Sequence, residues 1–257
     1  MFANAGVYKP CGIFTKGHFI LILATVLGIF VALKHSVGMT KEKVYKVIKK
    51  LTITMCIIEI FKIIYSISKN SLYDVNTYLP LYYCSMLLYA GLLSSFCKGT
   101  LKRVGDVCLA TGSIIGGSVF IIYPSTTLPT YPAFHFLSIH SFLFHGIMVY
   151  LGILINKTHY IELKKEDLKY FASLVGIMSI IAFAINGIFN SNLMFISQNF
   201  EVFPINAIYN LTNGEITFSL IMALAQMTLP FYAVYYVVEK IRSMEEEKVD
   251  LENASMC

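Results

Sequence analysis

The sequence predicts an all-α protein, a bundle of seven transmembrane helices, and three observations support this. Of the 257 residues, 56% are hydrophobic and 14% are charged, and the mean hydropathy is +0.67. In soluble domains about a quarter of the residues are charged. Seven long apolar runs are separated by short polar stretches, and the lysines are concentrated in alternate loops. This composition excludes an ordinary soluble domain and matches a chain that folds in a bilayer.

The apolar runs have the length that a membrane span requires. A helix that crosses the hydrocarbon core needs about 20 mostly apolar residues. The runs cover residues 18–33, 47–67, 78–96, 104–123, 134–155, 170–189 and 216–238. Because backbone groups in lipid must be satisfied internally, and no run alternates like a barrel strand, we expect helices. Residues 1–238 are expected to form one transmembrane domain, and 239–257 a charged cytoplasmic tail.

Loop charges predict the orientation, because lysine and arginine are retained on the cytoplasmic side. The first, third and fifth loops and the tail are rich in these residues, and the even loops are nearly bare. We therefore expect an N-terminus outside and a cytoplasmic C-terminus. The first run ends at Lys34 and His35 without a cleavage site after it, so it is predicted to be a retained span. The net charge of +5 is too scattered for a nucleic-acid groove.

Glu59 and Lys62 lie three residues apart in the second run and could pair across one helical turn. An ionisable residue at the centre of a span costs roughly 2.5–3.5 kcal/mol on insertion scales. The pair is therefore either structural or part of a polar cavity.

The third run places Cys84 shortly after Pro80, near the predicted outer end. A lone buried cysteine is usually a small hydrophobic residue, but a histidine that takes its proton would make it a nucleophile. In the fourth run, residues 112–118 are rich in glycine and serine and predict close helix packing, and Asp106 is expected at the cytoplasmic interface.

The fifth run contains His135, His140 and His145, five residues apart. This spacing rotates successive side chains by about 140°, so the three cannot share one helix face and a metal triad is not expected. We expect no metal and no cofactor. His135 is expected at the outer interface, and either His140 or His145 could line a cavity. Counted from the helix ends, Cys84 is closer in depth to His140 than to His145.

Three amides lie toward the predicted outer side: Asn186 and Asn192 at the end of the sixth run, and Gln226 in the seventh. Such groups commonly bridge helices in membranes. The connection 190–215 is too apolar for a free loop, which predicts a lid or a re-entrant segment. No Cys-x-x-Cys pair occurs, so neither a disulfide framework nor a zinc finger is expected.

Several short motifs resemble the YwaF-like integral membrane proteins of bacteria, a family related to transmembrane protein 164 of animals. The motifs are Leu79-Pro80-Leu81 followed by Cys84, the glycine-rich fourth run ending in Tyr123-Pro124, Phe134-His135-Phe136-Leu137 leading to His145-Gly146, and Asn186 with Asn192-Leu193-Met194-Phe195. The animal relative is regarded as a lipid acyltransferase that moves a fatty acyl group between glycerophospholipids. The resemblance implies Cys84 as nucleophile and His145 as base, with the outer-half amides as candidates for polarising the ester carbonyl. The residues alone leave His140 as the alternative base.

Three hypotheses follow from these residues. The first is an intramembrane phospholipid acyltransferase or lipid esterase, with phospholipids and lysophospholipids as partners and with Asn186, Asn192, Gln226 and Glu59 as substrate contacts. The second is a transporter or small-molecule binding protein with a polar cavity and no nucleophile. The third is a structural or assembly subunit. We expect a multi-pass protein of a bacterial plasma membrane.

Overall fold

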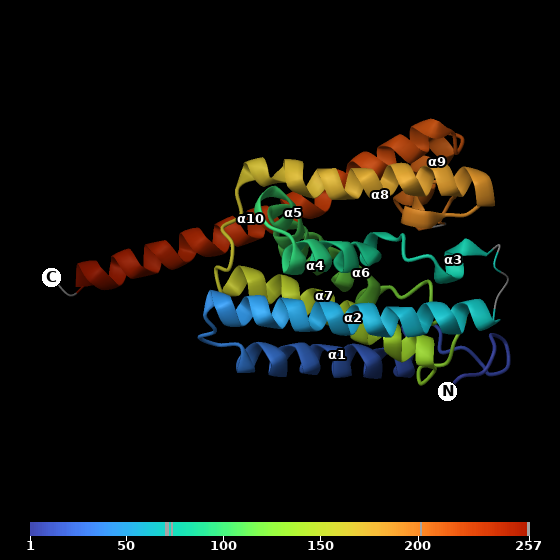
Figure 1. Ribbon diagram of the computed structural model, residues 1–257, viewed down its shortest axis with the longest axis horizontal. Helices are drawn as coiled ribbons and strands as arrows, with labels where there is room; N and C mark the ends of the chain where they lie inside the picture. Colours follow the sequence, from blue (N-terminus) through green and yellow to red (C-terminus); the bar gives the residue numbers. More distant parts are fainter. Residues whose placement is uncertain (70–71, 73, 201, 256–257) are drawn as a thin grey trace.

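A computed structural model describes residues 1–69, 72, 74–200 and 202–255, with side chains as far as Lys248 (Figure 1). Every element in this described part of the chain is a helix, and seven helical stretches are long and apolar enough to cross a membrane. The predicted fold class is therefore confirmed. The orientation of the termini stays a prediction, and residues 256–257 of the predicted tail lie outside the described residues.

The first, second and fifth spans are the continuous helices α1 (Lys16–His35), α2 (Lys41–Lys69) and α7 (Phe136–Lys157). The Thr15 hydroxyl accepts a hydrogen bond from the backbone N–H of His18 and so caps the first turn of α1. Lys34 and His35 occupy its last turn, where the helix dipole favours positive charge. Caps and dipole thus fix the ends of the first predicted span.

The third and fourth spans are broken, contrary to the continuous helices predicted from their hydropathy. The third consists of α3 (Val75–Tyr78), the 3₁₀ turn η1 (Tyr83–Ser85) and α4 (Met86–Phe96), and the fourth of α5 (Gly99–Ala110) and α6 (Gly112–Ile122). The first break contains Pro80. Proline has no N–H to donate within a helix, which explains why the helix is interrupted there. At the second break, a Cβ on Gly112 would contact Met86, Phe171 and Tyr83, so tertiary packing determines the path there.

The last two spans are α8 (Leu168–Phe189), preceded by η2 (Lys165–Asp167), and α10 (Ile216–Ser255), which continues the seventh span as one helix into the tail. Between them lie η3 (Leu193–Phe195) and the short helix α9 (Ile205–Leu211). Leu193, Met194 and Ile196 are almost completely buried. The connection therefore folds into the bundle, in agreement with the expectation that it is not a free loop.

The bundle has a buried centre and an exposed edge. About two-thirds of the residues are buried in the apolar windows of the fourth span and of α7, against 6% in α1 and 17% in α10. Helix α1 lies at the edge and packs on α7 (Figure 1). The exposed apolar surface of these outer helices is suited to contact with lipid.

The two ends of the bundle differ in charge. The connections α1–α2, α4–α5 and α7–α8 and the C-terminal tail lie at one end, which we call the lysine-rich end. The N-terminus and the connections α2–α3, α6–α7 and α8–α10 lie at the other, lysine-poor end (Figure 1). Asp106 is buried near the lysine-rich end and binds Lys102 at 2.9 Å and Ser94. The carboxylate of this ion pair is buried, whereas the Lys102 side chain is partly exposed. The expected position at the cytoplasmic interface stays a prediction.

Candidate active site

Cys84 lies at the N-terminal start of a helix that begins inside the membrane. It belongs to η1, and α4 follows two residues later. The turn is held by the backbone N–H of Ser85, which donates to the Tyr82 carbonyl oxygen at 2.9 Å. The Cys84 Sγ atom lies 3.8 Å from the carbonyl oxygen of Gly116 in α6. Cys84 thus keeps its thiol proton on a carbonyl of α6 and lies among the first residues of a helical turn, where N–H groups have no partner within the helix.

The two ring nitrogens of His145 have different environments. Nδ1 lies 2.6 Å from the carbonyl oxygen of Ser141, and since a carbonyl only accepts, Nδ1 carries a proton. In the neutral ring Nε2 is then unprotonated. This atom is buried and has no hydrogen-bond partner among the described residues. The ring stacks on Phe120 of α6, with 3.7 Å between the ring centroids. His145 therefore presents a free lone pair in a fixed ring orientation.

Two consecutive glycines bring Cys84 and His145 to the same turn of α6. The thiol contacts Gly116, and a Cβ on Gly117 would lie 2.7 Å from the carbonyl oxygen of His145. The predicted depth relation, with Cys84 closer to His140, is wrong, because the residues between α3 and η1 are not helical and counting along a straight span misplaces Cys84. Within the described part of the chain, no hydrogen bond joins the thiol to the imidazole.

His140 lies in a different interface, between α7 and α2. Its Nε2 is 3.3 Å from one carboxylate oxygen of Glu59, and Lys62 Nζ is 3.2 Å from the other. The predicted pairing of Glu59 with Lys62 is confirmed. Glu59 is 6% exposed, so a compact charged cluster lies inside the bundle. The sequence left His140 and His145 as equal candidates, and the structure assigns only His145 to the α6 side that Cys84 contacts.

The predicted amides hold the connection between α8 and α10. Asn186 donates to the Leu193 carbonyl oxygen at 3.0 Å and accepts from the Leu193 N–H at 2.8 Å. Asn192 accepts from the backbone N–H groups of Ser197 and Gln198. Gln226 of α10 donates to the Met194 carbonyl oxygen at 2.8 Å. These bonds bridge elements, as amides in membranes commonly do; the substrate contact implied by the resemblance stays a prediction.

Two further histidines have structural roles. His18 was only the boundary of the first predicted run, yet it is fully buried, and its ring nitrogens pair with the Ile121 carbonyl oxygen and the Phe14 N–H. Nothing in the sequence distinguishes it from an interfacial residue. His135 lies at the lysine-poor end, where its Nδ1 accepts from the Leu137 N–H and caps α7. Burial lowers the pKa of His135, although the hydrogen bond to the Ala3 carbonyl oxygen opposes this shift.

The described residues contain no cluster of three or more histidine, cysteine or acidic side chains that could hold a metal. The arrangement instead supplies a thiol and an imidazole with an unpaired nitrogen, both against α6. Fold and site together define a multi-pass integral membrane protein with polar groups in its core.

The family model described as TMEM164 family matches residues 13–241, and the chain belongs to this family. This agrees with the relation to transmembrane protein 164 expected from the motifs. No curated protein and no solved structure gives a significant match to the chain.

Proposed function

We propose that this protein is a phospholipid acyltransferase, or a lipid esterase when water replaces the acceptor, with Cys84 as nucleophile and His145 as base. The observation that carries the proposal is the position of both residues at one turn of α6: a thiol at a helix N-terminus and an imidazole with a buried, unpaired nitrogen. Membership of the TMEM164 family and its relation to an animal lipid acyltransferase support it.

The first half of the reaction transfers an acyl group to the protein. The thiol leaves the Gly116 carbonyl and gives its proton to His145 Nε2, and the thiolate attacks the ester carbonyl carbon. The carbon–oxygen bond to glycerol breaks, the departing alkoxide takes the proton from His145, and a lysophospholipid leaves. We assign the polarisation of the ester carbonyl to the first N–H groups of η1, at Tyr83 and Cys84, because those of Ser85 and Met86 already donate to carbonyl oxygens and the amide groups of Asn186 and Asn192 are used within the connection.

The second half returns the thiol. A lysophospholipid hydroxyl gives its proton to His145 and attacks the thioester carbon, the carbon–sulfur bond breaks, and the thiolate recovers the proton. Gly116 lies six residues, or about 9 Å, from the end of α6. One leaflet of the hydrocarbon core is about 15 Å deep, so a phospholipid ester must enter the bundle from the headgroup boundary to reach Cys84.

Acyl transfer between lipids in proteoliposomes tests the proposal. Liposomes would contain phosphatidylcholine with a deuterated acyl chain and an unlabelled lysophospholipid, and the labelled product would be measured by mass spectrometry. We expect Cys84→Ala and His145→Ala to lower the rate about a hundredfold or more. Cys97→Ala is the matched control, because Cys97 follows the opposite end of α4. Equal rates in wild type and Cys84→Ala would refute the proposal.

The cluster of Glu59, Lys62 and His140 supports a second candidate function, the binding or transport of a small solute. Charged groups inside a span commonly mark such a path. In that case Glu59→Gln abolishes uptake or binding, and Cys84→Ala leaves it intact. In either case we propose a bacterial plasma membrane as the location.

A further inference from the structure

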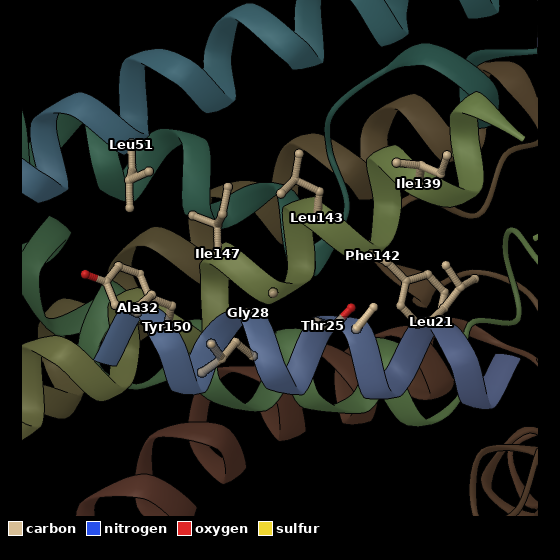
Figure 2. Close-up of a pocket in the computed structure, with 13 residues that line it drawn as sticks. Leu21, Thr25, Gly28, Ala32, Leu51, Ile139, Phe142, Leu143, Ile147 and Tyr150 are labelled. Atoms are coloured by element: carbon tan, nitrogen blue, oxygen red, sulfur yellow. The ribbon is translucent and has the colours of Figure 1, made fainter. Parts of the chain in front are cut away.

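Two hollows follow one another along the seam between α1 and α7. The larger is a groove of about 420 Å³ lined by α1, α7 and Leu51 of α2 (Figure 2). The smaller, of about 340 Å³, lies at the lysine-rich end, between the α1–α2 connection and the end of α7. On α7, residues 139, 143, 147 and 150 line the first hollow and 154 and 157 the second, so both occupy one face of this helix; Thr158, its C-cap, also lines the second.

Small residues on α1 create the groove. Ala24, Gly28 and Ala32 recur every fourth position and therefore share one face of the helix. A Cβ added to Gly28 would contact nothing within 4 Å. Opposite them, Ile139, Leu143 and Ile147 of α7 line the groove (Figure 2). The void is thus open space next to a helix that is otherwise covered with large apolar side chains.

The groove is suited to hydrocarbon. Of its lining side chains, only Thr25 and Tyr150 have polar atoms, and the Tyr150 hydroxyl is paired with Ser36 Oγ at 2.8 Å. From Leu21 to Ala32 the groove extends over eleven residues of α1, or about 16 Å. One leaflet of a hydrocarbon core about 30 Å thick has nearly this depth, so the length matches one acyl chain.

The smaller hollow is suited to a headgroup. It is lined by Ser36, Thr158 and Lys157 together with apolar residues, and Lys157 is its only charged lining residue. It lies where a chain that occupies the groove would reach the membrane surface, and the Tyr150–Ser36 hydrogen bond marks the boundary between the hollows. The lining contains no acidic residue that could pair with the Lys157 ammonium group, so this group can bind a phosphate.

We propose that the seam binds one bilayer phospholipid with an anionic headgroup, its acyl chain in the groove and its phosphate beside Lys157. Neither hollow is lined by Cys84 or His145. The site therefore goes beyond the proposed acyl transfer and does not depend on it.

Native mass spectrometry of the full chain in detergent, titrated with phosphatidylglycerol, tests the groove. The Gly28→Leu side chain fills the groove, and we expect bound lipid to fall about tenfold. Loss of the contacts of about two methylene groups already lowers the affinity by such a factor. Gly187→Leu on α8 is the matched control, since Gly187 is also helical and exposed with nothing within 4 Å of an added Cβ. This variant should bind like wild type. Ala24→Leu repeats the test if Gly28→Leu does not fold.

The headgroup assignment is tested with Lys157→Gln. Wild type should prefer phosphatidylglycerol to phosphatidylcholine, and the variant should lose the preference but still bind both lipids. Unchanged binding in Gly28→Leu and Ala24→Leu, or an equal loss in Gly187→Leu, would overturn the groove; an unchanged preference in Lys157→Gln would overturn the headgroup site. Both readouts measure bound lipid and not acyl transfer, which separates this outcome from that of the acyl-transfer assay.

Discussion

At the residue scale, His18 and His145 differ in the hydrogen bonds of their ring nitrogens, which indicates a structural role for the first and a chemical role for the second. Both are buried histidines in apolar surroundings, but both nitrogens of His18 are paired, whereas Nε2 of His145 has no partner among the described residues. A buried polar atom without a hydrogen bond costs about 1–3 kcal/mol. Such a cost is common where a site is kept ready for reaction.

We therefore expect His145→Phe to leave the free energy of unfolding unchanged or to raise it, while abolishing acyl transfer. His18→Phe, the matched control, should lower it by about 1–3 kcal/mol, because the Ile121 carbonyl and the Phe14 N–H lose their partner. Denaturant unfolding in detergent measures both values. A large loss of stability in His145→Phe would indicate a structural histidine.

His135 gives a pH dependence with a defined sign. Its neutral ring both donates to Ala3 and caps α7, and burial lowers its pKa. The folded protein then binds this proton at lower pH than the unfolded chain, so stability falls as pH drops from about 6.5 toward the lowered pKa, and not above 6.5. His135→Asn keeps a capping side chain without titrating. We expect its melting temperature to vary less with pH in this window; an identical slope would contradict this assignment.

At the scale of the elements, Asn186 determines the position of the connection between α8 and α10. Its amide pairs with both backbone groups of Leu193 and with Ser191 and Ser197. We expect Asn186→Ala to lower the unfolding free energy by at least about 2 kcal/mol, because several buried partners become unpaired. Asn210→Ala, at an exposed amide of α9, should change it by less than about 0.5 kcal/mol. Similar values for the two variants would contradict this role.

Element positions were predictable where hydropathy alone determines them. The seven spans follow from apolar runs of sufficient length, as α1 and α7 illustrate. The break at Thr111 was not predictable, because it arises from packing of Gly112 against α4, α8 and Tyr83. The partners of His140 and His145 could not be predicted from the sequence either. A five-residue spacing gives their relative rotation, but only packing determines which of them faces α6.

At the scale of the whole molecule, the segregated lysines predict that the lysine-rich end is cytoplasmic. Single-cysteine variants would test this by labelling in intact cells with a membrane-impermeant maleimide. In a background that lacks the native cysteines, we expect Thr130→Cys, at the lysine-poor end, to react. Thr158→Cys, at the lysine-rich end, should react only after permeabilisation. The reverse pattern would invert the orientation.

The most direct test of the central claim is the intact mass of the purified protein after incubation with mixed phospholipids. We expect wild type to gain the mass of one acyl group, hydroxylamine to remove it, and Cys84→Ala to show no gain. Cys97→Ala should behave like wild type. The account would be contradicted if no adduct formed while a thiol probe labelled Cys84 completely.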